Sequence, residues 1–243
     1  MRKAIAASYG MITIHTITYN EELLIQFMID HYRERFPGCK IVVYDNMSTD
    51  ETVKIALVNG CKVVPYDTNG QLQDSRYLKI KNNCWKTALT DWVLVCDLDE
   101  LLDINQAQLK KEENLGTTMV KCEFYDMINM KNDLDIPGMK FGVKSPVPGK
   151  FCLFNKKFIK EINYGPGCHE CKPLGTVRYS NQMCRLYHYV SPGEDITIEK
   201  FKIYKKRLSP ENIKNGWGSQ YLMTPEEIRQ EYSEERAKAV RIR

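Results

Sequence analysis

A run of apolar residues that ends in two carboxylates constrains this chain more than any other stretch. Residues 92–96 are apolar at successive positions, which is typical of a strand covered on both faces, as in a parallel α/β sheet. Asp97 and Asp99 follow directly. Such a pair is costly at the end of a buried strand unless a positive group joins it, and Mg²⁺ or Mn²⁺ prefers these oxygen ligands. The alternative is an acidic turn that caps the next helix, with Asp103 as a further cap.

Strand-like and helix-like segments alternate along the chain. Before residue 92, the pattern predicts strands at 11–18, 40–45 and 61–66, and helices at 21–35, 51–59 and 71–90. This order indicates a parallel sheet with right-handed crossovers. After residue 103, it predicts a helix at 105–113, strands at 117–130 and 184–189, a loop at 131–149 and helices at 194–208 and 225–243.

Composition limits the class of protein. The chain has 243 residues, 43% hydrophobic and 27% charged, with a net charge of +4. Because basic and acidic residues are mixed, we expect no nucleic-acid partner, although a phosphorylated substrate suits the charge. No apolar run approaches the roughly 18–20 residues of a membrane span, and residues 1–14 are too polar for a secretion signal. The nine cysteines are therefore expected to be free thiols in the cytoplasm.

Two enzyme classes place an Asp-x-Asp pair after such a strand: phosphatases of the haloacid-dehalogenase type, in which the first Asp is a nucleophile, and GT-A glycosyltransferases. The phosphatase pattern has Thr where this chain has Leu101. Three further motifs stand in order: Thr18-Tyr19-Asn20-Glu21, residues 45–52 (DNMSTDET), and a tail with His188-Tyr189, Lys200 and Arg207-Leu208-Ser209. With Asp97-Leu98-Asp99-Glu100, they make residues 10–221 resemble the family-2-like group of GT-A glycosyltransferases.

The resemblance implies a single α/β domain of the GT-A fold. A Rossmann-like half with a mainly parallel sheet, residues 10–104, would bind the nucleotide-sugar. A mixed half, residues 105–221, would bind the acceptor, and residues 222–243 would form a helical tail. The implied activity is metal-dependent transfer of a hexose from a nucleotide-sugar, in the first place a UDP-sugar, to a hydroxyl of a glycan or another acceptor, with inversion. The alternatives are the phosphatase and an inactive module that only binds nucleotide-sugars.

The resemblance also assigns residues to the donor. The nucleotide-sugar would contact Thr16, Thr18, Asn20, Glu21, Asp45, Asn46, Ser48, Arg76, Lys79, Asp97 and Leu98. Asp45 would accept hydrogen bonds from the uracil ring or the ribose. Two other interpretations stay open: residues 46–52 can also cap a helix, and Arg76 and Lys79 can be ordinary solvated helix charges.

The metal and the base are expected to come from several parts of the chain. Asp99 would ligate Mn²⁺ or Mg²⁺ directly, and Asp97 would face the ribose and the waters of the metal. His188 or His169 would supply a third ligand. An inverting enzyme needs a general base on the acceptor side, for which Glu170 and Asp126 are the candidates.

One spacing offers a competing use of His188. Cys168, Cys171, Cys184 and His188 match the spacing of zinc ligands, although chance matches are easy in a cysteine-rich chain. A structural zinc ion there would remove His188 from the catalytic metal.

Overall fold

Four parallel strands form the first half of the main sheet. The computed structural model describes residues 11–131, 134–147 and 149–243. The strands are β1 (Ile12–Thr18), β2 (Lys40–Asp45), β3 (Lys62–Pro65) and β4 (Trp92–Asp97). β1 pairs in parallel with both β2 and β4, and β3 extends the sheet beyond β2. The helices between these strands are α1 (Glu22–Arg35), α2 (Thr52–Val58) and α3 (Asp74–Lys81).

The second half of the sheet is mixed. Its strands are β5 (Glu100–Asp103), β6 (Met119–Ile128), β7 (Phe141–Lys144), β8 (Leu153–Asn155), β11 (Tyr179–Ser191) and β12 (Val240–Arg241). β8 joins the halves because it pairs antiparallel with both β4 and β6, while β11 runs parallel to β6 and antiparallel to β5. β9 (Ile159–Glu161) and β10 (Leu174–Gly175) form a separate small sheet. The predicted α/β class, with a parallel first half and a mixed second half, is confirmed.

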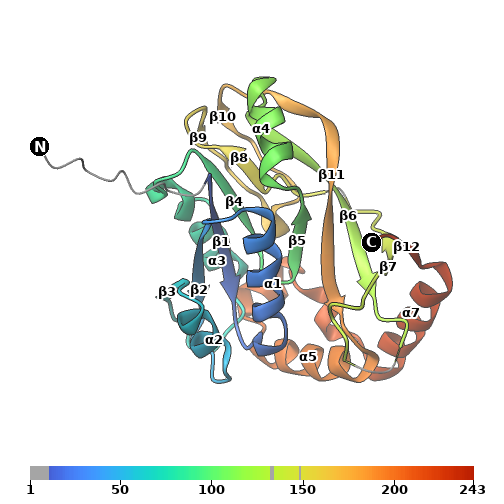
Figure 1. The fold of residues 1–243 in the computed structure, drawn as a ribbon. Helices are drawn as coiled ribbons and strands as arrows, with labels where there is room; N and C mark the ends of the chain where they lie inside the picture. Colours follow the sequence, from blue (N-terminus) through green and yellow to red (C-terminus); the bar gives the residue numbers. More distant parts are fainter. Residues whose placement is uncertain (1–10, 132–133, 148) are drawn as a thin grey trace, which may run out of the picture.

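Helices cover the sheet and one of its edges. α4 (Gln106–Asn114) follows β5, and α5 (Glu194–Arg207), α6 (Pro210–Asn215) and α7 (Pro225–Lys238) form the tail. Three short 3₁₀ turns are η1 (Cys84–Thr87), η2 (Pro166–Cys168) and η3 (Ser219–Leu222). In Figure 1, α1 lies in front of the sheet, and α5 and α7 lie along the edge toward which β1 and β6 point. The tail therefore covers the carboxyl ends of the strands.

The apolar run of β4 is buried on both faces, as predicted. Trp92 and Leu94 belong to a core cluster that includes α1, whereas Val93 and Val95 belong to a second cluster with Trp85. Alternation between two clusters follows from the two-residue period of a strand. Both faces of the strand pack against apolar side chains, which leaves its carboxyl end as the place where polar groups can meet.

Four predicted elements differ from the structure, and one of them is the helix expected at 225–243, because α7 ends at Lys238 and residues 240–241 form β12. The helix expected at 71–90 is α3 followed by η1, because the Asn82 side chain binds the backbone of Tyr164 with both its oxygen (2.8 Å) and its nitrogen (3.4 Å). A side chain that bonds backbone outside its helix competes with helix continuation. The expected loop at 131–149 contains β7, and the last strand extends over thirteen residues. No helix among the described residues is long and apolar enough to cross a membrane.

Candidate active site

Polar side chains gather where the parallel strands end. The strand registers pair Ile17 with Asp97 and Thr18 with Asp45, so the carboxylates of β2 and β4 flank the end of β1 at one edge. A cavity of about 280 Å³ opens there. Its ionisable lining residues are Glu21, Asp74, Tyr77, Lys81, Asp97, Asp99, Glu100, Lys150, His169, His188, Lys200, Tyr204 and Tyr221, together with Tyr19 and Cys168. Carboxylates and lysines thus face one another across a single space.

Two buried lysines hold Asp97. The Nζ of Lys81 lies 2.6 Å from Oδ1 of Asp97, and the Nζ of Lys150 lies 3.0 Å from Oδ2. Lys150 also pairs with Glu100. The two lysine side chains are only 7% and 4% exposed. Burial alone would raise the pKa of Asp97, but the two lysines outweigh it and hold that pKa far below its ordinary value.

Asp99 shares a third lysine with Glu21. The Nζ of Lys200, on α5, lies 3.4 Å from Oδ2 of Asp99 and 2.7 Å from Oε1 of Glu21. The hydroxyl of Tyr204 donates to the same oxygen of Glu21 at 3.2 Å. Although burial would raise the pKa of Asp99, Lys200 and His188 lower it. The tail is thereby tied to the ends of both β1 and β4.

His188 is oriented by a carboxylate behind it. Its Nδ1 lies 2.8 Å from Oδ1 of Asp126, its partner in the β6–β11 register, and its ring stacks on Phe124 with centroids 5.0 Å apart. The other ring nitrogen, Nε2, lies 3.8 Å from Oδ2 of Asp99. When Nδ1 carries the proton donated to Asp126, the lone pair of Nε2 is directed to the Asp99 side. This is how carboxylates orient metal-binding histidines in proteins.

These contacts separate the predicted metal ligands. Both oxygens of Asp97 are already bound to lysine, whereas Asp99 and His188 present carboxylate and imidazole atoms to each other. Among the residues the structure describes, no group of three or more His, Cys, Asp or Glu is gathered for a metal. Oδ2 of Asp99 and Nε2 of His188 thus lie close to each other, and Lys200 reaches the same oxygen of Asp99 at 3.4 Å.

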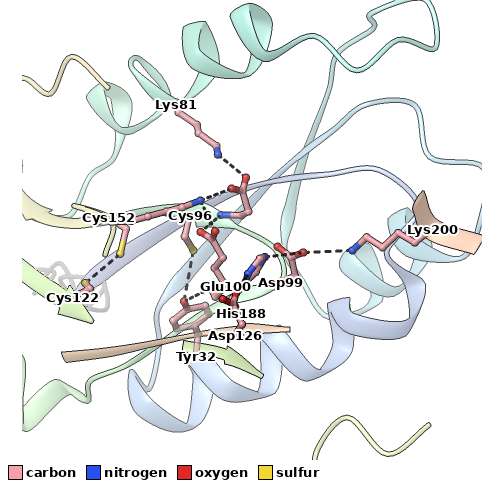
Figure 2. Close-up of polar contacts among 12 residues, drawn as sticks. Tyr32, Lys81, Cys96, Asp99, Glu100, Cys122, Asp126, Cys152, His188 and Lys200 are labelled. Carbon is pink, nitrogen blue, oxygen red and sulfur yellow. Dashed lines mark hydrogen bonds and ion pairs between the residues drawn. The ribbon is translucent and has the colours of Figure 1, made fainter. Parts of the chain in front are cut away.

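Hydrogen bonds from α1 and β11 fix the turn that carries Asp97 and Asp99. The hydroxyl of Tyr32 accepts from the backbone nitrogen of Leu102 at 3.1 Å and donates to the carbonyl of Glu100 at 3.2 Å. The backbone nitrogen of Tyr189 donates to the carbonyl of Asp99 at 2.8 Å. Figure 2 shows Tyr32 beneath the carboxylates. Helix α1 and strand β11 thus fix the turn on both sides.

The predicted nucleotide residues other than Arg76 and Lys79 fall into three groups. Thr18, Glu21, Asp97 and Leu98 line the cavity. Asn20 and Ser48 join the two loops, since the backbone nitrogen of Asn20 donates to Ser48 Oγ at 2.9 Å. Thr16, Asp45 and Asn46 are buried beneath them. Oδ2 of Asp45 accepts from the nitrogen of Ser48 at 3.1 Å, and Oδ1 has no protein partner.

Arg76 and Lys79 lie outside the cavity lining and are exposed. Lys81 lines the cavity instead. The sequence contained a signal for it, because Lys81 follows Tyr77 by four positions and shares its side of α3. No local signal marks Lys150. Its loop passes so close to β6 that a Cβ on Gly149 would lie 1.8 Å from the carbonyl oxygen of Cys122, which only glycine permits.

The two candidate general bases, Glu170 and Asp126, lie at different places. Glu170 is exposed and lines a separate cavity with Phe151, Tyr164 and Lys172. His169 borders this cavity and the central one, so it stands between them. Neither Glu170 nor Asp126 lines the central cavity, and Asp126 reaches it only through His188.

The four residues with the spacing of zinc ligands do not lie together. Cys168 and Cys171 belong to the core cluster of Val93, whereas Cys184 packs against the opposite cluster, and His188 pairs with Asp126. All nine cysteines lie in the described part of the chain and are free. The predicted free thiols are therefore present in the structure.

Comparisons of the sequence with known proteins find a matching family and a relative. The sequence profile of glycosyl transferase family 2 matches residues 13–167, more than half of the chain. An uncharacterized glycosyltransferase of Rickettsia typhi is 26% identical over 214 residues, which cover 84% of this chain and 69% of that protein.

Two solved structures show weaker similarity. Staphylococcus aureus TarS 1–349 with UDP is 16% identical at a TM-score of 0.47, covering 81% of this chain and 64% of that one. Mycobacterium tuberculosis glucosyl-3-phosphoglycerate synthase with Mn²⁺, UDP and glucosyl-3-phosphoglycerate is 16% identical at a TM-score of 0.39, covering 65% and 61%. The chain spans less than two thirds of both. On the family match, the chain belongs to glycosyl transferase family 2 and is a glycosyltransferase of the GT-A fold.

Proposed function

We propose that this glycosyltransferase transfers a hexose from a UDP-sugar to an acceptor hydroxyl, with inversion and with Mn²⁺ or Mg²⁺. The observation that carries the proposal is the convergence of Asp45, Asp97 and Asp99 at the carboxyl ends of β2 and β4, where buried lysines pair with Asp97 and Asp99. Ligands of open α/β sheets bind at this edge. Residues 10–104 would hold the donor, and residues 105–221 the acceptor.

Three lysines and a cation suit a nucleoside diphosphate. Lys81, Lys150 and Lys200 line the cavity with buried side chains and already offset the charges of Asp97, Glu100, Asp99 and Glu21, so a diphosphate there would need further positive charge from a cation. A divalent cation bound by Asp99 and His188 would supply Lewis acidity that neutralises charge on the leaving diphosphate. Asp97, fixed by two lysines, remains able to accept from a ribose hydroxyl through its remaining lone pairs.

The transfer step needs a carboxylate on the acceptor side. The acceptor oxygen forms a bond to the anomeric carbon, the bond to the diphosphate breaks with its electron pair, and the hydroxyl proton passes to the base. Glu170 is the proposed base because it lies in an open cavity that shares His169 with the donor cavity. Asp126 is the alternative.

Exchanging these two carboxylates for amides separates their roles. Glu170→Gln is expected to lower the rate of sugar transfer by about a hundred- to ten-thousandfold, while UDP binding in calorimetry stays unchanged, because it removes a base and not a ligand. Asp126→Asn is expected to weaken metal-dependent UDP binding, because Asp126 orients His188. If Asp126→Asn stops transfer but leaves UDP binding intact, and Glu170→Gln leaves both transfer and UDP binding unchanged, the base is Asp126.

Nucleotide binding tests the proposal most directly. Titration of UDP in the presence of Mn²⁺ should show binding, and Asp45→Ala should weaken it by about 1–3 kcal/mol because a charge-assisted hydrogen bond is lost. Incubation with UDP-sugars and acceptors then measures turnover, which an inactive binding module lacks. An unchanged dissociation constant for UDP in Asp45→Ala contradicts the assignment of this residue.

A further inference from the structure

A second cavity, of about 430 Å³, adjoins the central one at His169. Its walls are Phe151 and a hairpin of residues 163–172, which carries the proposed base Glu170. This volume lies in the range of small-molecule sites in proteins. Because His169 borders both cavities, a molecule in the second cavity lies next to the place proposed for the donor.

Hydrogen bonds between its two arms fix the hairpin. The backbone nitrogen of Gly165 donates to the carbonyl of Glu170 at 3.0 Å, and that of Lys172 donates to the carbonyl of Asn163 at 3.1 Å. Nδ2 of Asn163 donates back to the carbonyl of Lys172 at 2.9 Å. The wall is therefore formed before a ligand arrives, which lowers the entropy cost of binding.

Tyr164, in this wall, offers a peptide strand no free main-chain group. Peptides often bind by adding a strand to an open edge, where backbone groups lack partners. The nitrogen of Tyr164 donates to Oδ1 of Asn82 at 2.8 Å, and its carbonyl accepts from Nδ2 of Asn82 at 3.4 Å. The carbonyl of Phe151 accepts from the hydroxyl of Tyr164 at 2.7 Å. Because these groups are already paired, side chains must recognise the ligand.

A glycine turn places His169 between the two cavities. Gly167 has a φ of +69°, and a Cβ there would lie 2.9 Å from Cδ2 of His169. The ring of His169 packs against that of Phe124 with centroids 5.4 Å apart, and Phe124 stacks on His188 at 5.0 Å. A hydroxyl that passes His169 from the second cavity therefore arrives at the side of the central cavity where His188 lies.

The lining of the second cavity combines a flat apolar ring with polar side chains. Phe151 is half-buried, and its ring centroid lies 5.7 Å from that of the exposed Tyr179. Asn163, Glu170 and Lys172 line the same cavity and are exposed. A saccharide ring matches this lining, because one of its faces carries C–H groups and its rim carries hydroxyls. An alkyl chain would cover the carboxylate and the ammonium group without bonding them, which costs free energy.

We propose that the second cavity binds a saccharide acceptor, with a sugar ring against Phe151 and the reacting hydroxyl directed past His169. The inference rests on the proposed function and names the class of acceptor. The hydroxyl proton passes to Glu170, the acceptor oxygen bonds to the anomeric carbon of the hexose, and UDP leaves with the electron pair of the broken bond. The product is the acceptor glycan with one more sugar.

Acceptors of different classes test this on the unmodified protein. Methyl glycosides of glucose, galactose, mannose and N-acetylglucosamine are offered with Mn²⁺ and UDP-glucose, UDP-galactose or UDP-N-acetylglucosamine. A peptide that contains serine and threonine, and octanol, are offered in the same way. We expect transfer to at least one glycoside and to neither of the other acceptors. Saturation-transfer NMR with UDP and Mg²⁺ should detect binding of the same glycoside.

Two outcomes of this comparison overturn the inference. One is transfer to the peptide or to octanol alone, and the other is that no glycoside either accepts a sugar or binds. If UDP binds in these cases, the proposed function stands and only the saccharide assignment fails. If UDP does not bind, the proposed function fails as well.

Phe151→Leu removes the aromatic face and keeps an apolar side chain. The KM of the accepted glycoside should rise about three- to tenfold, with kcat and the dissociation constant of UDP unchanged. Phe158→Leu, at a position that is 46% exposed and outside the cavity lining, is the matched control. An unchanged KM in Phe151→Leu, or an equal weakening of UDP binding, overturns the inference.

Lys172→Met provides a second test if Phe151→Leu does not fold. Lys172 is exposed, and its hydrogen bonds to Asn163 use only the main chain of Lys172. Removal of the ammonium group should raise the KM of the glycoside about tenfold, because a charged donor to its hydroxyls is lost. An unchanged KM in this variant contradicts the inference in the same way.

Discussion

Asp99→Asn is expected to lower kcat for sugar transfer by about a hundred- to thousandfold, the loss typical when one preorganised electrostatic group is removed from an active site. The fold should survive, because Asn is isosteric and Lys200 keeps its 2.7 Å contact with Glu21. Metal-dependent UDP binding should weaken in the same variant. Initial rates and calorimetry with Mn²⁺ measure the two effects.

The control for this variant is Asp30→Asn. Asp30 is exposed on α1, accepts from Gln26 at 2.9 Å and does not line the central cavity. It should leave kcat unchanged. Full activity of the unmodified protein in excess EDTA would show that no divalent cation is needed, and Asp99 would then act only as the partner of Lys200 and His188.

Lys150→Met is expected to lower the free energy of unfolding by about 3–5 kcal/mol at pH 8, because it leaves a buried carboxylate without its counter-charge. Lys150 is the ion-pair partner of Glu100, and both are almost completely buried. Asp97 retains Lys81. Urea denaturation gives the difference in unfolding free energy from the unmodified protein.

The stability lost in Lys150→Met should become smaller as the pH falls. Burial raises the pKa of Glu100, and Lys150 opposes that rise. Without Lys150, folded Glu100 should bind its proton still more tightly than the unfolded chain does. Stability then increases as pH falls from 8 toward 5, so the deficit of Lys150→Met should shrink over that range. The lowered pKa of Asp97 acts in the opposite direction, but only below about pH 4, where unfolded Asp becomes protonated.

Two further variants check the assignment. Lys144→Met removes a lysine that is 62% exposed and pairs with Glu123, and exposed pairs contribute at most about 1 kcal/mol. Lys150→Met combined with Glu100→Gln should recover part of the lost stability, because the orphaned charge is gone. A deficit in Lys150→Met that is constant between pH 5 and 8 would mean that lost packing, and not the charge of Glu100, causes it.

The strand ends could be predicted from sequence because their causes are local. The continuous apolar run of β4 and the polar residues after β1 and β2 lie within a few positions of one another. Parallel strands bring their carboxyl ends to one edge whatever the side chains are. The structure places Thr18, Asp45, Asp97 and Asp99 at this edge. His188 lies next to Asp99 because β11 pairs with β5.

The sequence by itself determined that Glu21, Asp97 and Asp99 lie at the site, and only the tertiary structure added Asp74 and Glu100 and decided which groups neutralise these carboxylates. Lys150 is 53 positions from Asp97, and Lys200 is 101 positions from Asp99. Arg76 and Lys79 were equally basic and closer, yet they face outward while Lys81 faces inward. The charged groups meet because α3, the loop after β7 and α5 pack against the same edge of the sheet. Periodicity records which side of an element is apolar, but it does not record which distant lysine or arginine arrives there.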